Sequence, residues 1–185
     1  MQQLLFMNNL FKMKIQSGDI FLTTSKKSFL SKAIRFFTKS KISHSELLIK
    51  TWDYPLCYGA IGIGVRGTDI VRWISDKYII VRRPNKYLTG INKEEEKRIA
   101  TKACSRLGIK YDFMSLLYYQ VIYQLFGKWK GKTEQKALNR MYCSEFVAWV
   151  YDLPNWWEKS PEDLLEWSEF TTIYSGKGKD LKIEL

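Results

Sequence analysis

The 185-residue chain contains a single histidine, His44, and three cysteines that lie far apart at positions 57, 104 and 143. No CxxC pair is present, so the sequence offers too few His and Cys ligands for a zinc site. We therefore expect neither a metal nor another cofactor. The odd number and wide spacing of the cysteines also argue against a disulfide framework, which favours a reducing compartment.

Long apolar runs are missing as well. No stretch reaches the roughly 18 apolar residues of a membrane span. Residues 1–18 lack the basic start, sustained apolar run and small-residue cleavage site of a signal peptide. From these absences we expect a cytoplasmic or phage-associated protein. The length suits one domain, which we place at residues 17–185 after an N-terminal extension at residues 1–16.

Acidic residues are scarce beside basic ones, 19 against 30, and the formal net charge is +11. The basic residues are scattered along the whole chain. Such a charge fits either a solvated cationic surface or an anionic neighbour, which would be nucleic acid, a membrane surface or a cell-wall polymer. Because no helix-turn-helix, zinc-finger or RRM signature accompanies the charge, nucleic acid is the least favoured partner.

Hydrophobic patterning predicts strands in the first half of the chain and helices in the second. We expect strands at residues 20–24, 43–49, 57–65, 69–74 and 78–82. A short amphipathic helix is expected among them at residues 28–38. Further helices are predicted at residues 92–108 and 113–126, from residue 143 and from residue 160. This order of elements predicts the α+β class.

Cys143 is the cysteine in the most informative setting. It lies in residues 141–146 (MYCSEF), where a polar linker meets an amphipathic helix. A thiol at a helix N-terminus meets the positive end of the helix dipole and free backbone N–H groups, which lower its pKa and help to bind an oxyanion. An acyl-transfer nucleophile requires this environment. The alternative is a buried structural cysteine, which is our interpretation of Cys57 and Cys104.

His44 is the histidine available to act as a base for that nucleophile. It stands at the predicted start of a strand, after the polar turn at residues 39–43, so we expect it near a sheet edge and within reach of a cleft. An imidazole titrates in the useful range for proton transfer. The alternative interpretation is a surface histidine or one satisfied within the core.

Five segments occur in an order that matches a known family. They are GDIFL at 18–22, SHSELLI at 43–49, GIKYDF at 108–113, YCSEFVAWVYD at 142–152 and SPEDL at 160–164. Together they resemble the circularly permuted NlpC-type papain-like hydrolases, the YiiX-like group, to which lecithin retinol acyltransferase is also related. The resemblance covers residues 17–165. It implies an antiparallel sheet or small barrel packed against helices, with the histidine strand preceding the cysteine helix.

The resemblance also implies a mechanism. Cys143 would attack a carbonyl as a thiolate, and His44 would hold the proton and return it to the leaving group. The resulting thioester would be hydrolysed or passed to an acceptor. The backbone N–H of Cys143 would supply part of an oxyanion hole. Tyr142 and Asp19 are further candidates to donate or orient a hydrogen bond there.

One position departs from the family pattern. The family usually places Glu or His on the strand after the histidine strand, to orient the imidazole, whereas this sequence has Gly59. Glu46 is the candidate substitute, because strand residues two apart share a face. The alternative interpretation of Glu46 is a solvent-facing carboxylate. Without an orienting group the pair would work slowly, so a catalytically degenerate binding module on the same fold is one alternative function. A basic nucleic-acid-binding protein is the other.

The substrate class follows from the resemblance and the charge together. We expect an amidase or peptidase acting on a cell-wall (peptidoglycan) peptide, or an esterase or acyltransferase acting on a lipid acyl group. A cationic protein suits an anionic wall or membrane surface in either case. The apolar segment 113–126 is predicted to be a core or pocket-lining helix, with a lid or a membrane-surface element as alternatives.

Overall fold

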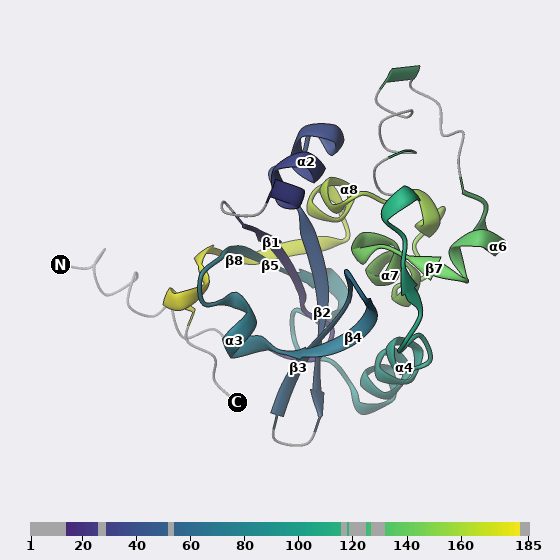
Figure 1. The fold of residues 1–185 in the computed structure, drawn as a ribbon. Coiled ribbons are helices and arrows are strands. Elements are labelled where there is room, and N and C mark those ends of the chain that lie inside the picture. The colour runs from purple at the N-terminus through teal and green to yellow at the C-terminus, as the bar shows by residue number, and fades with distance from the viewer. Residues whose placement is uncertain are drawn as a thin grey trace.

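A computed structural model describes residues 14–25, 29–51, 54–115, 118, 125–126 and 132–181. Its centre is a six-stranded antiparallel sheet with the strand order β4-β3-β2-β1-β5-β8 (Figure 1). These strands are β1 (Ile20–Thr24), β2 (His44–Thr51), β3 (Tyr54–Ile61), β4 (Gly64–Asp69), β5 (Tyr78–Pro84) and β8 (Phe170–Lys177). A parallel pair forms a second, small sheet from β6 (Lys110–Tyr111) and β7 (Arg140–Met141).

Helices connect and cover these strands. They are α2 (Phe29–Thr38), α3 (Ile70–Ile74), α4 (Lys93–Cys104), α6 (Glu134–Ala137), α7 (Cys143–Val150) and α8 (Pro161–Glu166), with short 3-10 turns η1 (Asn85–Tyr87), η3 (Trp156–Glu158) and η4 (Gly178–Asp180). The predicted α+β class, with an antiparallel sheet packed against helices, is confirmed. No helix in these described ranges is both long and apolar enough to span a bilayer.

Two helices begin where their capping residues predict. The Asn92 side chain accepts a hydrogen bond of 2.8 Å from the backbone N–H of Glu95, which starts α4. The Ser160 hydroxyl caps α8 in the same way, and Pro161 follows it at the first helical position. Local capping chemistry therefore fixes both starts without help from the tertiary structure.

Three strand predictions differ from the structure. The predicted strand 57–65 contains a turn, because β3 ends at Ile61 and β4 begins at Gly64, where φ is +130°. The predicted strand 69–74 is mostly the helix α3, whose Ile70 and Ile74 are both buried one helical turn apart. β8 was not predicted, although its Thr, Ile and Tyr residues suit a strand.

Two predictions fall on residues that are mostly or partly outside the described ranges. Of the expected helix 113–126, only residues 113–115, 118 and 125–126 are described. Of the expected N-terminal extension, only residues 14–16 are described, and Ile15 among them is buried in the core. The domain boundaries remain a prediction.

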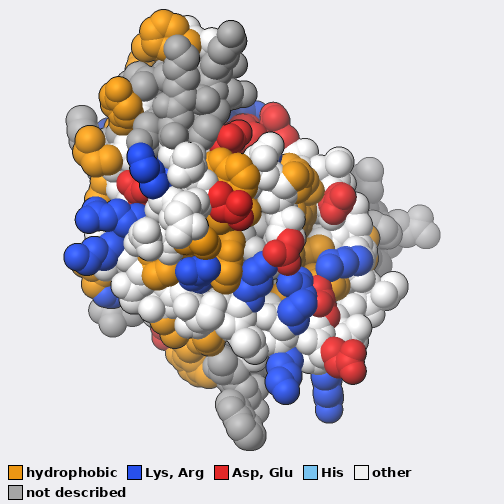
Figure 2. All heavy atoms as spheres, turned by 90° about the vertical axis from the view of Figure 1, so that its right-hand side faces the viewer, with side chains coloured by type: hydrophobic (Ala, Val, Ile, Leu, Met, Phe, Trp, Pro, Cys, Tyr) orange, Lys and Arg blue, Asp and Glu red, His pale blue; other side chains and the backbone are white. Residues whose placement is uncertain are grey.

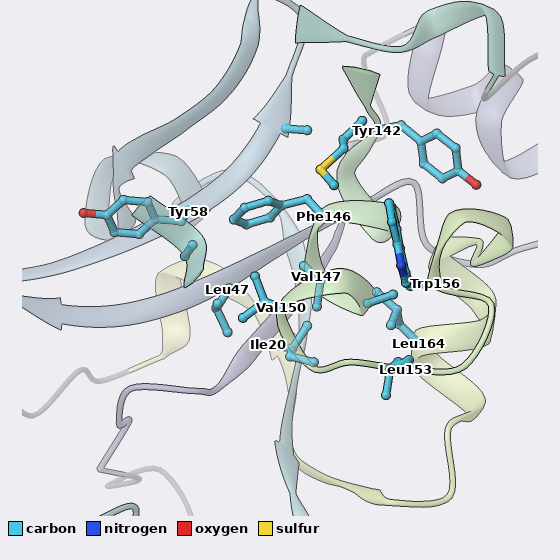
Figure 3. Packing of buried hydrophobic residues seen from close by; sticks show 14 of the residues in the cluster. Ile20, Leu47, Tyr58, Tyr142, Phe146, Val147, Val150, Leu153, Trp156 and Leu164 are labelled. Atoms are coloured by element: carbon cyan, nitrogen blue, oxygen red, sulfur yellow. The ribbon is translucent and has the colours of Figure 1, made fainter. Parts of the chain in front are cut away.

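The two faces of the sheet carry two hydrophobic clusters. Leu47 and Ile49 of β2 pack on the face that α7 covers, together with Phe146 and Val147 (Figure 3). Leu48 points to the opposite face, where the second cluster includes α3 residues and Phe21 of β1. Strand alternation therefore sends successive β2 side chains to opposite sides. The β2 strand is buried on both faces, which explains its continuous apolar run.

The surface around α4 carries charges of both signs. Its first turn holds Glu94, Glu95 and Glu96, and Arg98 pairs with Glu95 at 2.7 Å. Figure 2 shows the side of the molecule that carries α4 and α6, and basic and acidic side chains are interspersed across it. On this face the net positive charge is not gathered into one basic patch.

Candidate active site

Cys143 and His44 lie side by side, although they are nearly a hundred residues apart in sequence. Cys143 is the first residue of α7 and is fully buried. Burial alone would raise the pKa of its thiol, but the charge and hydrogen bond of His44, with a further hydrogen bond from the Ser45 backbone, hold that pKa below its usual value. This arrangement favours the thiolate.

His44 undergoes the matching change. Burial alone would lower the pKa of its imidazole, but the Cys143 sulfur and the Glu46 carboxylate together raise it to about 10. Each member of the pair thus stabilises the charged form of the other.

The end of β2 makes room for this pair. His44 is the first residue of the strand and pairs with Thr23 of β1, whereas β3 pairs with β2 only from Leu47 onward. The backbone pairing between β2 and β3 therefore stops before the first three residues of β2. The N-terminus of α7, which packs on β2 and β3, lies where the Ser45 backbone can reach Cys143.

Glu46 holds the other side of the imidazole. Its Oε1 atom lies 3.0 Å from His44 Nε2, and the carboxylate is fully buried. Because Nε2 faces Glu46, Nδ1 is the ring nitrogen left for the sulfur of Cys143. The Thr68 hydroxyl lies 3.4 Å from Glu46 Oε2 and helps to hold the carboxylate in place. The strand periodicity that suggested Glu46 from sequence produces this contact.

Gly59 explains why the carboxylate comes from β2. A Cβ atom at this position would lie only 2.5 Å from Glu46 Cγ. A side chain on β3 and the Glu46 side chain therefore compete for one space beside the imidazole. The glycine at the position where a glutamate was expected leaves that space to Glu46.

Tyr111 joins the site, although it was not among the predicted site residues. It is buried and hydrogen-bonds to Cys143, and burial together with this neighbour raises the pKa of its phenol well above the usual value. The parallel pairing of β6 with β7 brings it there, because Tyr111 is aligned with Met141, two residues before Cys143. The sequence feature that could have identified Tyr111 is its place in the segment GIKYDF, one of the five that carry the family resemblance.

Tyr142, a predicted oxyanion contact, packs in the core beside the site. Its ring is fully buried, and its backbone N–H donates to Glu145 Oε2 at 3.0 Å. That N–H is thereby engaged at the start of α7. The ammonium group of Lys132 lies 5.7 Å from the centre of the tyrosine ring.

Asp19, the other predicted contact, is placed elsewhere. Its carboxylate is buried against the Arg83 guanidinium, with contacts of 2.7 and 2.8 Å. It precedes β1, whereas Thr23, near the other end of β1, is the residue that pairs with His44. The structure therefore does not bring Asp19 to Cys143, because the length of a strand separates them.

A buried ionic cluster anchors the start of α7. The Lys132 ammonium lies 2.7 Å from Glu145 Oε2 and 2.9 Å from Asp112 Oδ2. Burial raises the pKa of Glu145 to about 8, although Lys132 opposes this effect. These contacts join the helix that carries Cys143 to the segment that follows Tyr111.

A cleft of about 210 Å³ opens beside His44 and Tyr111. The α2 helix covers one side of it, held there by a hydrogen bond of 2.7 Å between Ser31 Oγ and Ser43 Oγ. Trp73 lies on another side, with its ring 5.6 Å from the imidazole centroid. The lining residues are Thr23, Ser25, Ser31, Ile34, Ser43, His44, Ala60, Ile61, Gly62, Trp73, Lys77, Tyr111 and Phe113.

Comparison with known proteins adds three similarities. A family model described as "Permuted papain-like amidase enzyme, YaeF/YiiX, C92 family" matches residues 14–170. YiiX of Escherichia coli K12, described as an uncharacterized protein, is 30% identical over 145 residues, which is 76% of this chain and 59% of YiiX. The chain thus spans less than two thirds of that relative.

The third similarity is structural. A crystal structure of a protein described as metalloprotein yiiX from Escherichia coli O157:H7 aligns with a TM-score of 0.57 at 24% identity. The alignment covers 88% of this chain and 98% of the other. At this identity the likeness establishes a shared fold.

Proposed function

The chain belongs to the permuted papain-like amidase family, and we propose that it is a cysteine hydrolase with Cys143 as nucleophile and His44 as base. The family assignment confirms the YiiX-like, permuted papain-like resemblance of the five sequence segments. The observation that carries the proposal is the placement of His44 beside Cys143 at the start of α7, where each group shifts the pKa of the other toward its charged form.

The first half of the proposed reaction forms a thioester. The Cys143 thiolate adds to the substrate carbonyl, and the carbonyl π electrons move onto oxygen. The intermediate then collapses, the bond from carbon to the leaving group breaks, and the His44 imidazolium donates its proton to the departing amine or alcohol oxygen. In the second half His44 takes a proton from water, the hydroxide adds to the thioester, and the thiolate leaves. The acid product is released, and the thiolate and imidazolium are regenerated.

The negative oxygen of each intermediate needs hydrogen-bond donors. The backbone N–H of Cys143, at the start of α7, is one proposed donor, and the helix dipole assists it. The Tyr111 hydroxyl is the second, since it already contacts the sulfur. Tyr111 thus takes the place that the sequence suggested for Tyr142 and Asp19.

Glu46 is the proposed orienting residue. It accepts a hydrogen bond from Nε2 of the imidazolium, which directs Nδ1 to the sulfur and stabilises the positive ring. The alternative of a degenerate binding module was motivated by Gly59 and the missing orienting group. The buried carboxylate at 3.0 Å from His44 supports Glu46 in that role and favours the enzyme over the binding module.

The substrate belongs to the proposal as well. An amide in a cell-wall peptide or an acyl ester of a lipid suits the chemistry, with water or another acceptor completing the reaction. The Escherichia coli relative of known structure is described as a metalloprotein. In the described part of this chain, no group of three or more His, Cys, Asp and Glu residues is arranged to hold a metal ion.

The pH dependence of Cys143 alkylation tests the proposal. Iodoacetamide labelling, followed by mass spectrometry of the Cys143 peptide, should show reaction setting in below the usual thiol pKa of about 8.5. The reactive ion pair should persist until pH approaches about 10, where His44 loses its proton. In His44→Ala the onset should move to higher pH, since the neighbouring positive charge is gone.

The other cysteines provide the comparison. Cys57 is buried as interpreted from the sequence, whereas Cys104 is exposed and its interpretation as a buried structural cysteine was wrong. Labelling of Cys104 in the same sample therefore reports an accessible thiol that is not paired with His44, and Cys104→Ser should leave the Cys143 profile unchanged. Hydrolysis of p-nitrophenyl esters should also disappear in Cys143→Ala. If Cys143 shows the same pH dependence of alkylation as Cys104, and His44→Ala does not change it, the proposal is contradicted.

A further inference from the structure

The cleft beside His44 continues into a second cavity of about 310 Å³. Ser25 and Lys77 line both cavities, so the two adjoin at these residues. The second cavity, which we call the lysine arm, is lined by Thr24, Ser25, Ser75, Asp76, Lys77, Tyr78, Lys177 and Lys179. Three of its lining residues are lysines and one is acidic.

Lys77 stands at the junction of the cleft and the lysine arm. Its ammonium group lies 3.8 Å from the centre of the Trp73 ring, and Trp73 in turn packs beside the His44 imidazole. Among the described residues, no carboxylate lies within ion-pair distance of Lys77. Burial lowers the pKa of this lysine, while the charges of Glu46 and Asp76 oppose the change. Lys77 therefore has a half-buried positive charge available to a ligand.

The two other lysines are brought to the arm by the last strand. Lys177 ends β8 and pairs with Tyr78 of β5. The next residue, Gly178, donates its backbone N–H to the Lys77 carbonyl at 2.8 Å, and Lys179 follows in η4. A Cβ atom at Gly178 would lie 1.9 Å from the Ile74 carbonyl oxygen, so this close approach requires glycine. Segments a hundred residues apart are thus held together.

From this convergence we propose that the lysine arm binds an anionic group of the substrate, a carboxylate or a phosphate, while the scissile carbonyl lies at Cys143. The inference rests on the proposed function and assigns its substrate class. Lysine ammonium groups are point-charge donors suited to either anion, and Ser25 adds a hydroxyl at the junction of the two cavities. Trp73 provides an apolar wall between the anion site and the reacting centre.

Matched substrate pairs test this assignment. One member is a p-nitrophenyl ester whose acyl chain ends in a carboxylate, and the other ends in the neutral methyl ester of the same length, over a series of chain lengths. A third ester ends in a phosphate. We expect kcat/KM for at least one anionic ester to exceed that of its neutral partner by about tenfold. The anion that gives the larger preference distinguishes the carboxylate from the phosphate source.

Lysine substitutions connect the preference to the arm. Lys77→Gln should reduce the ratio of kcat/KM for the anionic and neutral esters to near unity. The double variant Lys177→Gln/Lys179→Gln should do the same, and because both positions are exposed, we expect it to fold normally. Lys97→Gln, an exposed lysine on α4, is the matched control and should retain it. Added salt should weaken the preference of the unmodified protein, because exposed charges are screened.

The possible failures are distinguishable. Equal rates for anionic and neutral esters, with cleavage still dependent on Cys143, would overturn the lysine arm and leave the hydrolase intact. A preference that survives both lysine variants would also overturn it. Loss of all cleavage that depends on Cys143 would contradict the proposed function itself.

Discussion

At the scale of single residues, the site depends on a competition for space between two neighbouring strands. Glu46 reaches His44 because Gly59, on the adjacent strand, has no side chain. The hydrogen bond between His44 and Glu46 then orients the ring and helps to raise the pKa of the imidazole. Both effects depend on the position of Glu46 beside His44, and a single substitution can test each of them.

Gly59→Ala should displace Glu46, because the new Cβ would lie 2.5 Å from Glu46 Cγ. We expect kcat/KM for ester hydrolysis to fall about 10²-fold, the usual effect of misplacing a catalytic group by about 1 Å. Gly67→Ala is the control, since its Cβ would meet the Tyr58 ring at an ordinary 3.4 Å. Equal activity in the two variants would show that Glu46 is not held by this contact.

Glu46→Gln addresses the same hydrogen bond through the pH profile. The carboxylate raises the pKa of His44, so its neutralisation should lower that pKa from about 10. Because the ion pair is lost as pH rises through the His44 pKa, the change in the Cys143 alkylation rate that accompanies this loss should occur at lower pH. A purely structural role for Glu46 would change the extent of labelling and leave the pH of that change as it is.

At the scale of elements, α7 is positioned by the buried ionic cluster at its first turn. Glu145 accepts the Tyr142 backbone N–H and pairs with Lys132, which also contacts Asp112. The second carboxylate oxygen of Glu145, Oε1, is buried without a hydrogen-bond partner among the described residues. A carboxylate in this state is easier to bury when protonated, which agrees with its raised pKa.

This raised pKa gives a pH dependence of stability with a definite sign. The folded-state pKa of Glu145 is about 8, whereas an unfolded glutamate titrates near about 4.3. Its contribution to the free energy of unfolding is therefore full at pH values below the unfolded pKa and is lost as pH rises through about 8. Glu145→Gln should reduce the fall in unfolding free energy over this range, by on the order of 2 kcal/mol.

Urea denaturation across this pH range measures the effect. Glu94→Gln, in the first turn of α4, is an exposed control and should leave the pH dependence as it is. A pH dependence that is identical in the wild-type protein and Glu145→Gln would mean that Glu145 remains ionised throughout, as a simple ion pair with Lys132.

At the scale of the whole molecule, the candidate active site and a buried ion pair lie at opposite ends of β1. Thr23 pairs with His44 at the end of the sheet that bears the cleft. At the other end, the Asp19 carboxylate and the Arg83 guanidinium form a buried ion pair, and Arg83 also donates to the Lys14 carbonyl at 2.9 Å. The two ends are joined by a sheet that is packed on both faces.

Asp19→Ala should separate these roles. Removal of one partner leaves the Arg83 charge buried and unpaired, which should lower the free energy of unfolding by about 3–5 kcal/mol. Urea denaturation measures this loss, and the exposed Glu169→Ala provides the control. In the protein that remains folded, the pH profile of Cys143 alkylation should be unchanged, and a shifted profile would place Asp19 in the site after all.

Much of the fold and part of the site follow from local patterns in the sequence. The polar-to-apolar boundary before Cys143 predicted the start of α7, and a strand period of two placed His44 and Glu46 on one face. Asn92 and Ser160 marked helix starts through their own capping bonds. Each of these features depends on residues a few positions apart, so the sequence by itself determined them.

Other features were decided by contacts between distant segments. The run at residues 70–74 has strand-like composition but is helical, because helical spacing buries Ile70 and Ile74 together against the sheet. Tyr111 reaches Cys143 only through the pairing of β6 with β7. Lys77 meets Lys177 and Lys179 only because β8 pairs with β5. No local period encodes such pairings, since their free energy arises from packing and backbone hydrogen bonds that exist only once the chain has folded.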